Sequence, residues 1–167
     1  MVETLLASPQ QAAQRLYPAA VPAPESDWAI GLSITVDADA RRISQALTEP
    51  EYLETWISMP DQSQGSWIVA SRKANGYRLD HCRAGSVIAS VMGSFLFCHQ
   101  RKMRLLWRNA TRPHLAESLV DFRIRGNFAS SILELRHTAL RSSDEFHWHR
   151  ELWRTSLARL ASVMRSA

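Results

Sequence analysis

The side chains that could carry out chemistry in this sequence are few. Along one predicted strand, the polar side chains of His81 and Arg83 share a face with Tyr77 and Leu79. An inward-facing histidine can act as a general base or donate a hydrogen bond to a polar ligand atom. It can also bind a backbone or solvent group and serve only the structure. His81 and Arg83 are the inward acid–base candidates of this pattern, so an enzymatic role is left open and is not favoured.

His147 and His149, on either side of Trp148, could suggest a metal site. Residues two apart on a helix point in different directions, whereas a helical metal-binding pair needs a spacing of about four. Asp80 and Asp121 are expected to point to solvent by strand alternation, so a pair of catalytic carboxylates has no support. The sequence also contains no G-x-S-x-G motif and no glycine-rich phosphate loop. We therefore predict neither a metal nor another cofactor.

The composition is that of a globular chain with a basic surface. The 167 residues carry a net charge of +4, and 46% of them are hydrophobic. The basic residues are scattered rather than clustered, so no nucleic-acid partner is expected. No apolar run approaches the roughly 18 residues of a membrane span. Cys82 and Cys98 are too few for a disulfide scaffold, and the N-terminus lacks the pattern of a signal peptide. These features predict a cytoplasmic protein with reduced cysteines.

The elements that must position these side chains begin with the last stretch of the chain, residues 143–167. Its apolar residues recur at helical spacing and form one stripe: Phe146, Trp153, Leu157, Leu160 and Met164. Ser143 with Asp144 offers an N-cap, and a helix from about 144 to about 165 is roughly 30 Å long. That length is sufficient to cross a whole sheet.

Two tryptophans depend on the rotational phase of this helix. We expect Trp153 to be buried against Trp107 or Phe122, where one large ring fills the middle of the interface between helix and sheet. Trp148 lies one helix face away. We expect Trp148 to be exposed and therefore tolerant of substitution.

Before this helix, most of the chain alternates as strands. Residues 28–36 form one predicted strand, two short helices follow within 37–59, and six further strands with short turns occupy 66–140. Gly93, inside the longest strand, predicts a bend or bulge. Consecutive strands with short turns form an antiparallel meander, and one apolar face per strand means that one side is covered. The predicted fold class is α+β: a curved, antiparallel seven-stranded sheet wrapped on a long C-terminal helix, with two short helices after the first strand.

The first 27 residues are predicted to be an extension of this domain, which spans 28–167. Ser8 and Pro9 are suited to the start of a short helix, and Pro22 and Pro24 belong to a proline- and alanine-rich linker. Such a helix is too short to be stable alone. It therefore packs on the domain or frays.

Several segments resemble one known family. VDADARRISQALTEPEYLETWI (Val36–Ile57) resembles its opening, where a helix ending in A-L-T leads to a second helix ending in Trp. Gly93 with RKMRLLW (101–107) resembles its mid-sheet signature. LELRHTAL (Leu133–Leu140) and LWRTSLARLASVM (Leu152–Met164) resemble its end. The family is that of the activator of heat-shock protein 90 ATPase homologues, within the START-like (SRPBCC, Bet v 1-like) helix-grip superfamily. The resemblance covers about Trp28 to Met164.

The sequence departs from the family pattern at a few positions. Leu152 stands where the family commonly has glycine before the terminal-helix Trp, and Asn75-Gly76 replaces a Gly-Gly pair. His81 and Arg83 also make the expected interior more polar than a simple lipid pocket. These departures are compatible with the fold and leave the class of ligand open.

The resemblance implies a space between the sheet and the terminal helix, which the inward side chains either fill as a core or line as a ligand cavity. The residues expected there are Trp56, Met59, Leu79, His81, Met103, Leu105, Trp107, Phe122, Ile124, Trp153 and Leu157. The leading hypothesis is non-enzymatic binding of a small hydrophobic or amphipathic molecule. The alternatives are an interaction module that binds a chaperone, as the family name implies, and a cyclase- or aromatase-like enzyme. A homodimer is also left open.

Overall fold

The protein is described by a computed structural model that covers residues 28–60, 65–111, 117–126 and 129–166. The short helix and the linker that the sequence predicts within 1–27 lie outside the described residues. The predicted boundary of the domain at residue 28 therefore stays a prediction.

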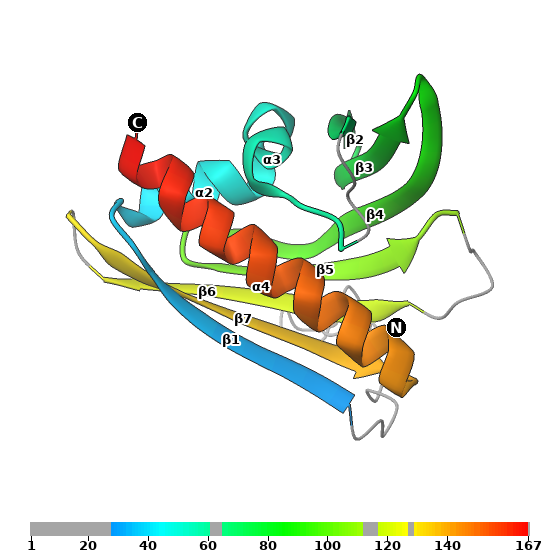
Figure 1. The fold of residues 1–167 in the computed structure, drawn as a ribbon. Helices are drawn as coiled ribbons and strands as arrows, with labels where there is room; N and C mark the ends of the chain where they lie inside the picture. The colour runs from blue at the N-terminus through cyan, green and yellow to red at the C-terminus, as the bar shows by residue number, and fades with distance from the viewer. Residues whose placement is uncertain (1–27, 61–64, 112–116, 127–128, 167) are drawn as a thin grey trace, which may run out of the picture.

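Seven strands form one antiparallel sheet, as the alternation predicts (Figure 1). The strands are β1 (Trp28–Val36), β2 (Ser66–Lys73), β3 (Gly76–Arg83), β4 (Ser86–His99), β5 (Lys102–Asn109), β6 (Ser118–Gly126) and β7 (Ser131–Leu140). Strands β2 to β7 follow each other as a meander, and β1 closes the order by pairing with β7, so that the sheet reads β1-β7-β6-β5-β4-β3-β2. The two edges of the sheet are therefore β1 and β2.

Three helices accompany the described sheet: α2 (Ala40–Thr48), α3 (Pro50–Trp56) and α4 (Ser143–Ser166). The long helix α4 crosses one face of the sheet diagonally, and α2 and α3 lie beside its C-terminal half (Figure 1). Asp39 starts α2, where its carboxylate accepts a hydrogen bond of 2.8 Å from the backbone N–H of Arg42. Among the described residues, no helix combines the length and the apolar character that crossing a bilayer requires.

The start of α4 differs by one residue from the expected cap. The hydroxyl of Ser142, not that of Ser143, accepts a hydrogen bond of 3.1 Å from the backbone N–H of Glu145. The Glu145 carboxylate in turn accepts a bond of 2.8 Å from the backbone N–H of Arg141. The first bond satisfies an N–H group that the first turn of a helix leaves without a partner, and the second holds the residue just before the cap, so that together they fix where α4 begins.

Gly93 does not mark a bulge, one of the two features that the sequence suggested for this position. It pairs in regular register with Tyr77 of β3 and with Trp107 of β5. A Cβ atom at this position would lie 2.9 Å from the Tyr77 ring and 3.0 Å from Leu105 Cδ2. Glycine is therefore needed because the aromatic ring packs directly on the backbone. The register of β4 shifts elsewhere, at Ile88 against β3 and at Leu96 against β5.

The edge strand β2 is partly covered by α3 and the residues before it. The Glu54 carboxylate accepts a hydrogen bond of 2.7 Å from the backbone N–H of Ala70, and Glu49 pairs with Arg72. An unprotected edge offers free N–H groups to other strands. These two glutamates occupy part of that edge.

Candidate functional site

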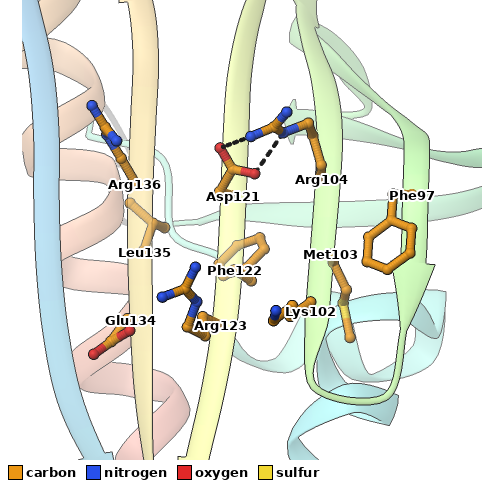
Figure 2. A pocket seen from close by; sticks show the side chains of 10 residues that line it. All are labelled: Phe97, Lys102, Met103, Arg104, Asp121, Phe122, Arg123, Glu134, Leu135 and Arg136. Carbon is orange, nitrogen blue, oxygen red and sulfur yellow. Dashed lines mark hydrogen bonds and ion pairs between the residues drawn. The ribbon is translucent and has the colours of Figure 1, made fainter.

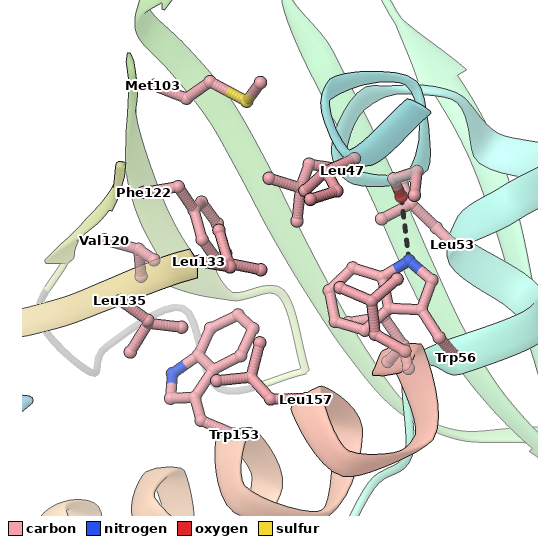
Figure 3. Close-up of a cluster of buried hydrophobic side chains, with 14 of the residues drawn as sticks. Leu47, Leu53, Trp56, Met103, Val120, Phe122, Leu133, Leu135, Trp153 and Leu157 are labelled. Atoms are coloured by element: carbon pink, nitrogen blue, oxygen red, sulfur yellow. Dashed lines mark hydrogen bonds between the residues drawn. The ribbon is translucent and has the colours of Figure 1, made fainter. Parts of the chain in front are cut away.

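The space between the sheet and α4, here called the grip interior, is the site that the sequence predicts. All eleven candidate residues are buried, and each has at most 3% of its surface exposed: Trp56, Met59, Leu79, His81, Met103, Leu105, Trp107, Phe122, Ile124, Trp153 and Leu157. Figure 3 shows several of these side chains meeting between the sheet, α3 and α4. A void of ligand size would leave its lining accessible to solvent-sized molecules. The grip interior is therefore filled by its own side chains.

Trp153 lies at the centre of this packing, as the sequence predicts. Its side chain is completely buried. Its ring centroid lies 5.0 Å from that of Trp107 and 5.8 Å from that of Phe122. Such tilted and edge-to-face arrangements are favourable for aromatic rings beyond the area that they bury. Three aromatic residues from β5, β6 and α4 thus form the middle of the core.

A chain of hydrogen bonds runs through this aromatic cluster. The Trp153 indole N–H donates to His137 Nδ1 at 2.9 Å, and His137 Nε2 lies 2.7 Å from Ser118 Oγ. The Ser118 hydroxyl donates to the Trp107 carbonyl oxygen at 3.4 Å. Because an indole nitrogen can only donate, His137 must be neutral with its proton on Nε2. Each group then has a partner, and α4 is tied to β7, β6 and β5.

The electrostatics of the two nearby histidines agree with this arrangement. Burial, with a further contribution from His149, holds the pKa of His137 well below its ordinary value. Burial also lowers the pKa of His149, although a hydrogen bond from its Nδ1 to the Glu145 carbonyl oxygen opposes the change. The two rings stack edge-to-face with centroids 4.5 Å apart. Neutral imidazoles can be held in this way, whereas a buried charge would be costly.

The C-terminal half of α4 is joined to the segment after α3 by Ser156. This serine is fully buried, accepts a hydrogen bond of 2.9 Å from the Ser58 backbone N–H and donates one of 3.3 Å to the Ser58 carbonyl oxygen. Trp56 is fixed nearby, since its indole N–H donates to the Ala46 carbonyl oxygen at 2.8 Å. Entry to the grip interior from this end would require these bonds to separate.

The two residues proposed for acid–base chemistry are separated by the structure. His81 is buried and faces the grip interior, but Arg83 is exposed, which corrects the expectation that both point inward. Arg83 is the last residue of β3, opposite Ser66 at the start of β2, and the end of a strand is left exposed. Asp80 and Asp121 lie on the opposite side of the sheet, where each pairs with an arginine: Arg78 and Arg104, respectively.

Trp148 is also placed differently from the expectation. It is half-buried and packs against the core, with its ring 4.9 Å from that of His149.

No group of three potential metal ligands occurs within the part of the chain that the structure describes. The sequence did not predict the buried hydrogen-bonding roles of Ser118 and Ser156, because a serine among apolar residues does not stand out in the hydrophobic periodicity.

The outer face of the sheet, opposite to α4, carries an apolar patch at the end formed by β2, β3 and β4. Trp67 of β2 pairs with Cys82 of β3, which pairs with Val87 of β4, so that these three form a row. Val69 and Ile88 lie beside the row. Trp67 is 46% exposed and Val87 is 54% exposed. We call Trp67, Val69, Val87 and Ile88 the outer patch.

These elements define the fold of the chain. A curved antiparallel sheet of seven strands, two helices between its first and second strands, and a long C-terminal helix across one face make up the START-like helix-grip fold. The fold class predicted from the sequence is therefore confirmed.

Solved structures of the same fold include an HSP90 activator and an Aha1 dimer. An HSP90 activator from Plasmodium falciparum matches with a TM-score of 0.62 and 15% identity, over 83% of this chain and 96% of that one. The Aha1 dimer from Colwellia psychrerythraea matches with a TM-score of 0.58 and 15% identity, over 81% and 95%. The resemblance seen in the sequence is thus borne out as a shared fold.

A protein of a biosynthetic locus shares the fold as well. DynU16, from the dynemicin biosynthetic locus, matches with a TM-score of 0.59 and 17% identity, over 84% of this chain and 48% of that one. No protein-family model matches the sequence, and no curated protein matches it.

Proposed function

We propose that this protein is a non-enzymatic interaction module that binds a protein partner through the outer face of its sheet. The observation that carries the proposal is the filled grip interior, in which every candidate cavity residue is buried. A closed core makes the fold a rigid scaffold, and recognition is then left to its surface. Contiguous exposed apolar side chains on a soluble domain are typical of interaction sites.

The outer patch is the surface best suited to this role. Its tryptophan and three aliphatic side chains are each between 40% and 54% exposed. Tryptophan is enriched among residues that dominate binding energy at protein interfaces. The Glu54 carboxylate already occupies the Ala70 N–H on the edge of β2, so side-chain contact is favoured over the addition of a strand.

The partner that we propose is a chaperone of the heat-shock protein 90 class. Support comes from the shared fold of the Plasmodium HSP90 activator and of the Colwellia Aha1. Both matches rest on fold, so the partner must be tested directly. The exposed location of the outer patch makes its side chains suitable for that test, because they can be changed without disturbing the core.

The test is a pull-down with the heat-shock protein 90 of the same organism, together with its ATPase rate. Trp67→Ser and Val87→Ser should each reduce capture by about tenfold or more if they lie in a central contact. Ile132→Ser is the matched control, since Ile132 is 45% exposed but lies on β7, beyond the outer patch. Absence of capture by the unmodified protein, or equal losses in all three variants, would contradict the proposal.

A second candidate function is binding of a hydrophobic or amphipathic molecule in the grip interior, through the eleven residues described above. The observation in its favour is the Ser58–Ser156 junction, where two hydrogen bonds join α4 to the segment after α3. Separation of these bonds would give access to Trp56, Met59 and Leu157.

Ser156→Ala should then increase uptake of an apolar fluorescent dye, and a panel of fatty acids, sterols and aromatic polyketides should quench the fluorescence of Trp153. A dye signal that Ser156→Ala leaves unchanged, with no quenching, would exclude it.

The enzymatic alternative has the weakest support. His81 faces the interior, as that alternative requires, but Arg83 is exposed and cannot act with it there. The polar chain from Trp153 to Ser118 is buried, and its donors are directed at acceptors within the protein. We therefore propose no catalytic residue.

A further inference from the structure

A pocket on the outer face of β4 to β7 has no role in the function proposed above. It has a volume of about 450 Å³ and is lined by Phe97, Lys102, Met103, Arg104, Asp121, Phe122, Arg123, Glu134, Leu135 and Arg136. Figure 2 views it from the side opposite to α4, which lies behind the strands. Four of the lining side chains are basic and two are carboxylates, so the pocket is positively charged.

The register of the strands explains why one of these cations lacks a counter-ion. Arg104 of β5 lies opposite Asp121 of β6, which lies opposite Arg136 of β7. Both oxygens of Asp121 accept hydrogen bonds from Arg104, at 2.6 and 3.2 Å, and these bonds raise the pKa of the Arg104 guanidinium. Asp121 is thus engaged by one neighbour. Arg136 forms no ion pair with any residue that the structure describes.

The next row of side chains leaves two more cations uncompensated. Lys102 of β5 lies directly opposite Arg123 of β6, and Arg123 lies opposite Glu134 of β7. Glu134 pairs with Arg125 instead, at 3.3 Å. Like charges directly opposite each other on neighbouring strands are destabilising. Within the described residues, neither Lys102 nor Arg123 has a carboxylate within ion-pair distance.

Three exposed cations that have no ion-pair partner among the described residues therefore surround one pocket: Lys102, Arg123 and Arg136. Figure 2 shows the Arg123 guanidinium between the other two. We propose that this pocket binds a small-molecule anion that carries at least two negative charges. Guanidinium groups bind phosphate and carboxylate through two parallel hydrogen bonds, which suits either oxyanion. The bound anion would relieve the repulsion between Lys102 and Arg123.

Phe97 indicates the second part of such a ligand. Its ring is 52% exposed at the β4 side of the pocket, opposite Arg104 in register. From β4 to β7 there are three spacings between strands, or about 14 Å. An organic phosphate or polycarboxylate of this length places its charges near Arg123 and Arg136 and an apolar group on Phe97. A volume of about 450 Å³ is within the usual range for small-molecule sites.

The experiment measures binding at low salt by calorimetry and by backbone amide NMR shifts. The probes are pyrophosphate, phenyl phosphate, citrate and, as a monovalent control, acetate. We expect the multivalent probes to bind and to shift amides of β5 to β7, while acetate binds at least tenfold more weakly. Arg123→Gln and Arg136→Gln should each weaken pyrophosphate binding about tenfold, which is the loss of one charge-assisted contact. Phe97→Ala should affect phenyl phosphate alone.

Arg159→Gln is the matched control, because Arg159 is an exposed cation on α4, on the other side of the sheet. It should bind every probe as the unmodified protein does. Preference for citrate over the phosphates assigns a polycarboxylate, and the reverse preference assigns a phosphate ester. Equal binding of acetate, or losses in Arg159→Gln as large as those in Arg123→Gln, would overturn the proposal. Tighter binding of a polyglutamate peptide than of every small anion would also overturn it, in favour of an acidic protein partner.

Discussion

Strands β5, β6 and β7 present one face to α4 and the other to solvent, and the two faces differ in how fully their side chains find partners. On the inner face, Trp107, Phe122 and His137 are buried and joined to Trp153 by ring contacts and hydrogen bonds. On the outer face, Lys102 and Arg123 lie opposite each other as like charges. The same three strands therefore carry a closely packed core on one face and like charges that repel each other on the other face. We expect the stability of the domain to depend mainly on the first face, and we propose recognition on the second.

Removal of Trp153 should produce the largest change in stability, and it tests most directly whether the inner face is the one that stabilises the domain. Trp153→Ala removes a fully buried indole, which typically costs about 3–5 kcal/mol through lost transfer free energy and the cavity that remains. Since a domain of this size is stable by about 5–15 kcal/mol, the melting temperature should fall sharply. Trp67→Ala, at a residue that is 46% exposed, should change the free energy of unfolding by about 0.5 kcal/mol or less. Equal losses in chemical denaturation would contradict the assignment of the two faces.

A second substitution tests how tightly the inner face is packed. Gly93→Ala would place a Cβ atom 2.9 Å from the Tyr77 ring, closer than ordinary contacts allow. We expect a loss of about 1–3 kcal/mol, the usual cost of overpacking a core. Gly31→Ala is the matched control on β1, since no atom lies within 4 Å of the added Cβ there. If both variants melt alike, the Tyr77 ring can move aside and the inner face is looser than described.

The stability of the inner face should depend on pH because of His137. Its pKa is lowered in the folded protein, so the unfolded chain takes up the proton first. Stability is therefore fully present above about pH 6.5 and is lost as the pH falls below that value, by at most about 1.4 kcal/mol per pH unit for one proton. Denaturant titrations between pH 8 and pH 5 measure this slope.

His137→Gln separates this residue from its neighbour His149, whose pKa is also lowered. The glutamine amide can accept from Trp153 and donate to Ser118 without titrating. The variant should retain only the part of the slope that His149 contributes. An unchanged slope would assign the pH dependence to other groups.

The smallest effect is expected on the outer face. Lys102→Gln removes one of two like charges that lie opposite each other, so the free energy of unfolding should stay the same or rise by a few tenths of a kcal/mol. Thermal melting at low and high salt measures the difference, and salt should abolish it, because exposed charges are screened. A clear loss of stability would show that Lys102 has a structural partner and would remove it from the proposed anion pocket.

The strands and their faces could be predicted because they follow from alternation alone. The inward positions of Met103, Leu105 and Trp107 along β5 need no information beyond the spacing of apolar residues. The position of Trp153 followed from helical spacing in the same way. Turn composition between consecutive strands was sufficient to give the order of the meander.

Other features could not be predicted, for physical reasons that differ. Arg83 is exposed as the last residue of β3, and alternation alone does not show where the covered part of a strand ends. The half-burial of Trp148 depends on how α4 is seated on the sheet, which spacing within the helix does not determine. Whether the grip interior is filled or hollow depends on summed side-chain volumes and on rotamers, to which hydrophobic periodicity is insensitive. For that reason the eleven interior residues stay a prediction as a ligand site.

The closeness of Trp107 and Trp153 has a spectroscopic consequence. Two indole chromophores with centroids 5.0 Å apart and planes inclined by 55° couple their excited states, which produces a paired positive and negative band in circular dichroism. One ring belongs to β5 and the other to α4, so the amplitude of that band reports the distance between helix and sheet. Movement of the helix away from the sheet would abolish the paired band before any secondary structure melts. The protein therefore has an intrinsic optical signal for the packing of α4 on the sheet, and no attached label is required.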